Sequence, residues 1–139
     1  MHVQSVLLAI FVQVTLTFAL MFALAFTRVR AVSRKEVRAR DIALGQPNWP
    51  EHQTKLGNAF RNQFELPVLF FAAGISAFVL GFADAAMIAL AWLFALSRIA
   101  HAWVHVTTNR IRHRRPAFVL GFLALGAMWA LIAWRLAAS

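Results

Sequence analysis

Two groups of polar residues recur at helical spacing inside otherwise apolar sequence, and their side chains could bind a small polar molecule. The first group consists of Asn58, Arg61, Asn62 and Glu65, and it ends just before Pro67. Because a helix turns by about 100° per residue, residues at these intervals share one face. A carboxylate beside two amides suits a ligand that presents an amine and peptide-like groups.

The second group lies farther along the chain and is mostly basic. It comprises Arg98, His101, His105, Asn109 and Arg112. An unpaired charge inside a bilayer costs several kcal/mol, so we expect Arg98 to face a partner, and Glu65 is the natural one. A plain salt bridge between two helices is the alternative interpretation. Two histidines one turn apart could ligate a metal or haem, but no His-Glu-x-x-His motif or third ligand accompanies them, and hydrogen bonding to a ligand suits them better. We therefore predict no metal site.

The composition indicates that these residues belong to a membrane protein. Of the 139 residues, 61% are hydrophobic and 14% are charged, and the mean hydropathy is +0.67. A soluble domain of this size is much more polar. The formal charge of +9 could indicate nucleic acid, but the basic residues gather in two connections and at helix ends, so we predict no nucleic-acid partner. The chain has no cysteine, so any thiol chemistry needs a thiol from a substrate.

Four apolar stretches must position the polar groups, and we predict that each spans the membrane within a single domain, 1–139. The expected spans are 3–27, 57–82, 85–106 and 117–134. The first is expected to be retained rather than cleaved as a signal peptide, because its basic residues follow the apolar run. Pro67 removes a backbone hydrogen bond near the start of the second span and is expected to kink it. The predicted fold class is an all-α membrane protein, a bundle of four transmembrane helices.

The distribution of lysine and arginine predicts the orientation. The expected connections 28–56 and 107–116 hold seven and four basic residues respectively, whereas the connection between the second and third spans holds none. Basic connections remain on the cytoplasmic side, so both termini are expected on the opposite side. Within the first connection, residues 33–43 are expected to form a short surface helix with a Glu36–Arg40 pair.

These features resemble the MAPEG family, the membrane-associated proteins in eicosanoid and glutathione metabolism. The resemblance rests on the four spans, the long first connection and two motifs. The motifs are Asn62-Gln-Phe-Glu65-Leu-Pro67 and Arg98-Ile-Ala-His101-Ala-Trp-Val-His105, in which histidines stand where the family has tyrosines. The similarity covers nearly the whole chain. Residues 62–71 look like uncharacterised bacterial members, which implies an integral protein of a bacterial inner membrane.

The resemblance implies a homotrimer surrounded by membrane lipids, with glutathione as cosubstrate bound between subunits near the cytoplasmic face. On the matching positions, the glutathione contacts would be Asn62, Glu65, Arg98, His101 and His105, with Arg30 and Asn58 as further candidates. Arg112 matches, by its spacing from Arg98, the arginine that stabilises the glutathione thiolate, and is the predicted catalytic residue. A thiol with a pKa near 8.5 is about 3% ionised at pH 7, so lowering that pKa by one unit raises the thiolate fraction nearly tenfold.

The expected function is therefore that of a glutathione-dependent transferase or peroxidase acting on lipophilic electrophiles. The alternative is a non-catalytic protein of the same fold that binds another small polar or thiol ligand or has a structural role. A small multidrug transporter also has four short spans, but such transporters depend on a glutamate in the first helix. Residues 3–27 contain no charged residue, which disfavours transport.

Overall fold

The computed structural model describes residues 2–138, and within that range every regular element is helical. The elements in chain order are α1 (His2–Ser33), η1 (Ala39–Asp41), α2 (Glu51–Arg61), η2 (Asn62–Phe64), α3 (Leu66–Val79), α4 (Ala85–Val106) and α5 (Ile111–Ala138). Four stretches in this part of the chain are long and apolar enough to cross a membrane: Gln4–Ser33, Glu51–Val79, Ala85–Val106 and Ile111–Ala138. The predicted all-α, four-span fold class is confirmed.

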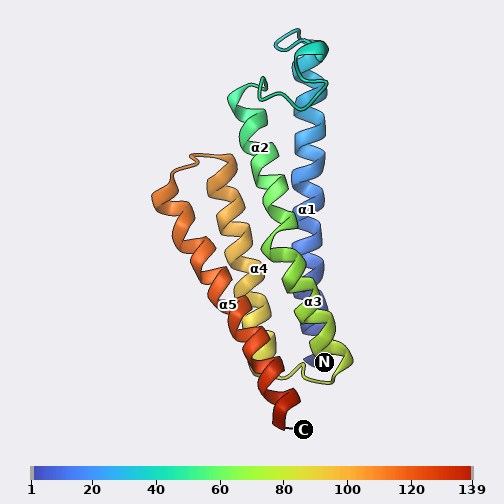
Figure 1. Ribbon diagram of the computed structural model, residues 1–139, viewed down its shortest axis with the longest axis vertical. Helices are drawn as coiled ribbons and strands as arrows, with labels where there is room; N and C mark the ends of the chain where they lie inside the picture. The colour runs from blue at the N-terminus through green and yellow to red at the C-terminus, as the bar shows by residue number, and fades with distance from the viewer. Residues whose placement is uncertain (1, 139) are drawn as a thin grey trace.

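The helices form an elongated bundle in which α4 packs against α1, α2, α3 and α5 (Figure 1). The helix α1 runs beside α2 and α3, which follow one another along the same side of the bundle. The helix α1 begins, and the helix α5 ends, at the end of the bundle where the α3–α4 turn lies. The connections 34–50 and 107–110 lie toward the opposite end, which we call the basic end.

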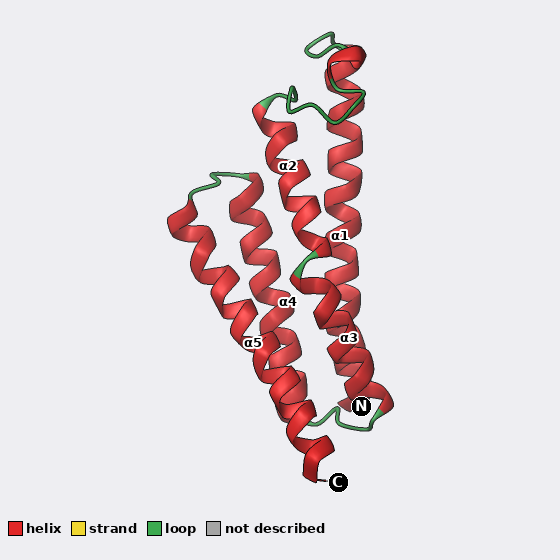
Figure 2. Cartoon of the chain, viewed as in Figure 1, coloured by secondary structure: helices red, strands yellow, loops and turns green. Residues whose placement is uncertain are grey.

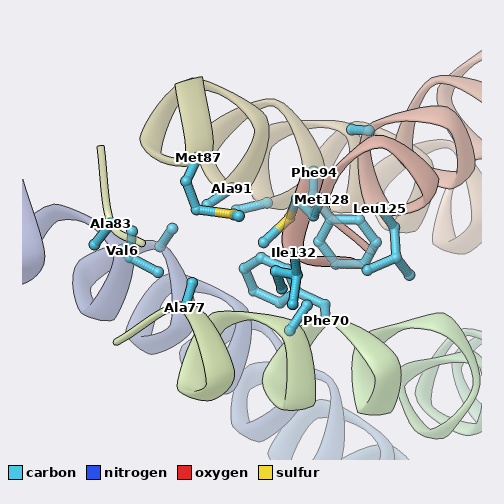
Figure 3. Packing of buried hydrophobic residues seen from close by; sticks show 14 residues of the cluster. Val6, Phe70, Ala77, Ala83, Met87, Ala91, Phe94, Leu125, Met128 and Ile132 are labelled. Carbon is cyan, nitrogen blue, oxygen red and sulfur yellow. The ribbon is translucent and has the colours of Figure 1, made fainter. Parts of the chain in front are cut away.

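A hydrophobic core lies in the half of the bundle that is remote from the basic end (Figure 3). Its centre is the stacked pair Phe70 and Phe94, with ring centroids 4.4 Å apart, and both side chains are fully buried. A β-carbon on Gly74 would lie 2.7 Å from Ile10 Cδ1, so glycine lets the Ile10 side chain pack directly against the α3 backbone. Because lipid tails are as apolar as these side chains, the helices associate here through close packing.

The second predicted span is interrupted rather than simply kinked (Figure 2). The helix α2 ends at Arg61, and the 3₁₀ turn η2 leads to Glu65, whose φ and ψ of −100° and −108° are not helical. Proline lacks an N–H and its ring clashes with the carbonyl four residues earlier, which prevents a helix from continuing through Pro67. Proline fits well in a first helical turn, and α3 accordingly begins at Leu66 with Pro67 next to it.

A buried pair of glutamines anchors this interruption to α1. Gln13 Nε2 donates to Gln63 Oε1 at 2.7 Å, and Gln63 Nε2 donates to the Ala59 carbonyl oxygen at 2.9 Å. In apolar surroundings an unpaired amide is costly, so each hydrogen bond fixes the position of η2 relative to its neighbours.

The helix ends near the basic end differ from the expected ones. The helix α1 continues to Ser33, α2 begins at Glu51, and α5 begins at Ile111. The predicted surface helix over 33–43 is wrong, since this stretch contains only the end of α1 and η1. Lys35 adopts a positive φ of 60° and the Glu36 amide donates to the Ala31 carbonyl, which ends α1 as a left-handed cap does.

Asp84 joins α4 to the end of α5 on the side opposite the basic end. Its carboxylate accepts a hydrogen bond from the Met87 amide at 3.0 Å, as an N-cap residue does, and forms an ion pair with Arg135. Arg135 also donates to the Phe82 carbonyl at 2.9 Å. The Met87 hydrogen bond, with a further contribution from Arg135, holds the pKa of the Asp84 carboxyl below its usual value.

We predict that Asp84→Ala destabilises the protein by about 0.5–2 kcal/mol at neutral pH, because the N-cap is lost. Because the pKa of Asp84 is lower in the folded than in the unfolded protein, the ionised carboxylate contributes to the free energy of unfolding. This contribution is complete above the unfolded-state pKa of about 3.9 and disappears as the pH falls through the folded-state pKa. The difference in melting temperature between wild type and variant should therefore shrink as the pH is lowered from 6 toward about 3. Thermal melting in detergent measures this, with Asp84→Asn as the variant that keeps a capping side chain. A difference that is independent of pH would contradict the interpretation.

Candidate functional site

A cavity of about 370 Å³ lies between η2 and the ends of α4 and α5 that face the basic end. Its lining residues are Asn62, Glu65, His101, His105, Ile111, Arg114, Arg115 and Phe118. This volume falls within the range of about 300–1,000 Å³ that is usual for small-molecule sites. Six of the eight lining side chains are polar, so the cavity suits a polar ligand.

Behind this cavity, the buried Arg98 holds Asn62 in place. Arg98 Nη2 donates to Asn62 Oδ1 and to the Asn62 carbonyl oxygen at 3.3 Å, and Asn62 Nδ2 donates to Glu65 Oε2 at 2.8 Å. In a continuous α-helix that carbonyl would accept from the amide of Leu66, so the interruption of the span makes it available to Arg98. The three side chains form a chain of hydrogen bonds from the core to the cavity.

The partner of Arg98 is therefore an amide, although Glu65 was the expected one. No ion pair in the part of the chain that the structure describes involves Arg98, and Asn62 stands between the two charges. Because the guanidinium is fully buried and its bonded partner is neutral, its charge is compensated only at a distance. This arrangement leaves a positive potential at the back of the cavity.

Several buried polar atoms around the cavity have no hydrogen-bond partner in the described chain. They are Nε and Nη1 of Arg98, Nε2 of His101 and Nδ1 of His105. His101 Nδ1 lies 3.2 Å from the Arg114 carbonyl oxygen, which assigns the proton to Nδ1 and leaves Nε2 as an acceptor. A buried polar atom without a partner costs about 1–3 kcal/mol. Since His101 and His105 line the cavity whereas Arg98 does not, the two histidine nitrogens are the atoms that indicate a ligand there.

The turn between α4 and α5 brings Arg114 to the cavity. The helix α4 ends at Val106, and Asn109 adopts a positive φ of 50°, a conformation that asparagine tolerates better than most residues. Asn109 Oδ1 then accepts a hydrogen bond from Arg114 Nη1 at 2.8 Å. This contact fixes the Arg114 guanidinium beside the two histidines.

The structure brings together most, but not all, of the residues that the sequence singled out. Asn62, Glu65, His101 and His105 line the cavity, and Arg98 lies directly behind it. Arg112 is exposed on α5 and does not line the cavity. Its prediction extended the periodicity of α4 through residue 112, but the chain reverses at 107–110 and that periodicity ends.

Two further predicted residues lie elsewhere at the basic end. Arg30 is exposed in the last turns of α1 and does not line this cavity, and Asn58 lines a separate pocket with Arg28 and Arg61.

Sequence reasoning missed the contributions of α5 to the cavity. Its residues there are Ile111, Arg114, Arg115 and Phe118, which share one helix face. That pattern was present in the sequence, but it becomes visible only if α5 begins at Ile111 rather than after Pro116.

Comparison with known proteins agrees with this architecture. The model of the MAPEG family matches residues 6–134, nearly the whole chain. The chain belongs to the MAPEG family. A search of curated proteins and a search of solved structures each found no match. Together with the four apolar helices, the family makes this a multi-pass membrane protein.

We predict that Asn62→Ala destabilises this MAPEG protein by about 1–3 kcal/mol, because Arg98 loses its side-chain acceptor while staying buried. Asn58→Ala is the matched control, since Asn58 lies one turn earlier, is exposed and should stay within about 0.5 kcal/mol of wild type. Thermal or denaturant unfolding in detergent compares the two variants. Equal stability of the two would show that the Arg98–Asn62 contact is energetically unimportant.

Proposed function

We propose that this MAPEG protein is a glutathione-dependent transferase or peroxidase that acts on lipophilic electrophiles. The observation that supports this best is the pair of unpartnered buried nitrogens, His101 Nε2 and His105 Nδ1, on residues that line a cavity together with a carboxylate and two arginines. Glutathione presents an ammonium group, two carboxylates, two amides and a thiol. Each kind of group has a complementary side chain at this cavity. An apolar ligand would not need these polar side chains.

The charges at the cavity suggest how glutathione is oriented. Glu65, held by Asn62, suits the ammonium group, and Arg115 suits a carboxylate, with which a guanidinium forms paired hydrogen bonds. His101 and His105 supply hydrogen-bonding nitrogens between these ends. Arg98 does not reach the cavity surface, so in this proposal it is a positioning residue that acts through Asn62.

Arg114 is the cation best placed to stabilise a thiolate, because Asn109 holds it at the cavity. In the transferase reaction the thiol loses its proton and the thiolate sulfur forms a bond to an electrophilic carbon. Either a leaving group departs from that carbon with the bonding electron pair, or a carbon–carbon double bond opens and the carbanion takes up a proton. In the peroxidase reaction the sulfur attacks the peroxide and releases an alcohol, and a second glutathione then displaces water to form the disulfide. In both reactions the protein contributes proximity and stabilisation of charge.

Orientation and assembly belong to the same proposal. The basic end faces the cytoplasm, because basic connections are retained there, and both termini face the opposite side of a bacterial inner membrane. The single domain 1–139 assembles as a homotrimer surrounded by lipid. Arg30 and Arg112 are exposed and lie outside the cavity of their own chain, so a role for either of them requires the cavity of a neighbouring copy.

Glutathione binding tests the proposal through Glu65. Removing the carboxylate in Glu65→Gln should weaken binding at least tenfold, since a hydrogen bond to a charged group contributes about 1.5–3 kcal/mol. Isothermal titration of the detergent-purified protein measures the affinity, and Glu36→Gln, at an exposed carboxylate away from the cavity, is the control. Absence of saturable binding at millimolar glutathione would exclude glutathione as the ligand.

The identity of the thiolate-stabilising cation is tested separately with Arg114→Gln and Arg112→Gln. We expect Arg114→Gln to abolish the ultraviolet absorbance of bound thiolate and to lower kcat for conjugation at least tenfold, the factor that corresponds to one pKa unit. The variant Arg112→Gln should keep the thiolate absorbance and the kcat of the wild type. The opposite result would assign the role to Arg112 of a neighbouring copy. Saturable binding without thiolate absorbance or turnover in the wild type would instead support a non-catalytic binding protein.

A further inference from the structure

The interruption between α2 and α3 is attached to a helix that does not itself line the cavity. Gln13 of α1 is fully buried, and its Nε2 donates a hydrogen bond to Gln63 Oε1 at 2.7 Å. Gln63 is the middle residue of η2, next to Asn62. None of the residues that line the cavity belongs to α1, so an effect of Gln13 on a ligand there has to pass through η2.

Gln13 is a polar side chain at a position that otherwise suits an apolar one. The other buried residues in the described part of α1 are all apolar: Val6, Ala9, Leu20, Leu24 and Ala31. Together with Gln13 they recur at intervals of three, four and seven residues, which places them on one helix face. Gln13 Oε1 is buried without a hydrogen-bond partner, and an unpaired buried amide oxygen destabilises a fold. Packing alone therefore does not explain the amide.

The contact between the two glutamines matters more for geometry than for stability. Hydrogen bonds between membrane-spanning helices contribute little net stability, because the separated helices find other partners. Successive residues of a 3₁₀ turn, however, point about 120° apart, so Asn62 and Gln63 reach toward different helices. Arg98 of α4 holds Asn62. Gln13 of α1 holds Gln63. Two attachments in different directions fix the rotation of η2 about its own axis, which a single attachment leaves free.

The rotation of η2 sets the position of the Glu65 carboxylate. Glu65 directly follows η2, its Oε2 accepts a hydrogen bond from Asn62 Nδ2 at 2.8 Å, and both residues line the cavity. Gln63 Nε2 also donates to the Ala59 carbonyl oxygen in the last turn of α2 at 2.9 Å, so one amide joins α1 to the end of α2. Without the Gln13 contact, the carboxylate and the Asn62 amide are free to shift relative to the histidines of α4.

We propose that Gln13 is a positioning residue of the candidate site, which acts through Gln63 to orient η2 and thereby directs the Glu65 carboxylate toward the ligand. This inference rests on the proposed function, in which Glu65 binds the ammonium group of glutathione. Arg114, which stabilises the thiolate in that function, is held by Asn109 from the α4–α5 turn. Loss of the Gln13 contact should therefore weaken glutathione binding and leave kcat unchanged.

The test compares two variants and a control as full-length protein purified in detergent. Gln13→Leu removes the donor and leaves Gln63 Oε1 unpaired, whereas the double variant Gln13→Leu/Gln63→Leu removes both partners and leaves no unpaired side-chain amide. Thr17→Val is the control, because Thr17 lies one turn farther along α1 and its hydroxyl donates to the Gln13 carbonyl within the same helix at 3.0 Å. The measurements are the melting temperature, the Kd of glutathione by isothermal titration, kcat and KM for conjugation, and hydrogen–deuterium exchange of the backbone amides in 62–66.

We expect the double variant to melt within about 3 °C of the wild type, because replacing both partners of a buried hydrogen bond by apolar groups is nearly neutral. In both variants the amides of 62–66 should exchange about tenfold faster, since this segment opens more easily. The Kd and KM of glutathione should rise about fivefold or more while kcat stays within about twofold, the pattern of lost ground-state binding. Thr17→Val should match the wild type in every measurement.

Unchanged exchange at 62–66 in both variants would overturn the proposal, and so would faster exchange with unchanged affinity for glutathione. A fall in kcat as large as the loss of affinity, or equal effects in Thr17→Val, would indicate general damage to the bundle and would overturn it as well. If the wild type itself binds no glutathione, the proposed function fails, and the exchange of 62–66 alone then decides whether Gln13 orients η2.

Discussion

The buried guanidinium of Arg98 is the constraint on which the rest of the polar end depends. It is fully buried inside a membrane-spanning helix, and it needs acceptors that an unbroken apolar helix cannot offer. The interruption at 62–65 supplies them as the side chain and carbonyl of Asn62. The same contact places Asn62 against Glu65, so the interaction that makes the buried charge tolerable also sets the geometry of the cavity.

The hydrophobic core and the polar cavity lie in different halves of the bundle. The half around Phe70 and Phe94 is apolar and closely packed, and it gives α3 and α4 a fixed relation to each other. Toward the basic end the core gives way to the Gln13–Gln63 pair and then to the cavity. Pro67 lies at the boundary, because it stands in the first turn of the apolar helix α3, just after the polar interruption.

Hydropathy predicted the four spans, because length and apolarity alone decide which segments can cross a bilayer. Helical periodicity found the residues of η2 and α4 that meet at the cavity, and all three basic residues of α4 lie on its buried face. The contribution of α5 was missed for a physical reason. Whether Arg112 or Arg114 faces the cavity depends on the residue at which α5 begins, and the left-handed Asn109 sets that start. Likewise, the charge of Arg28 predicted topology, but its confinement beside Gly57 and Trp49 is a tertiary feature that spacing does not encode.

The most direct test is an experimental structure of the protein in lipid with glutathione bound. Glutathione should lie in the cavity between η2, α4 and α5, with its ammonium group on Glu65 and its polar atoms within hydrogen-bonding distance of His101 Nε2 and His105 Nδ1. Arg98 should keep its contacts with Asn62. Glutathione bound at another place, or histidine nitrogens that find hydrogen-bond partners within the protein itself, would show that this cavity is not the glutathione site.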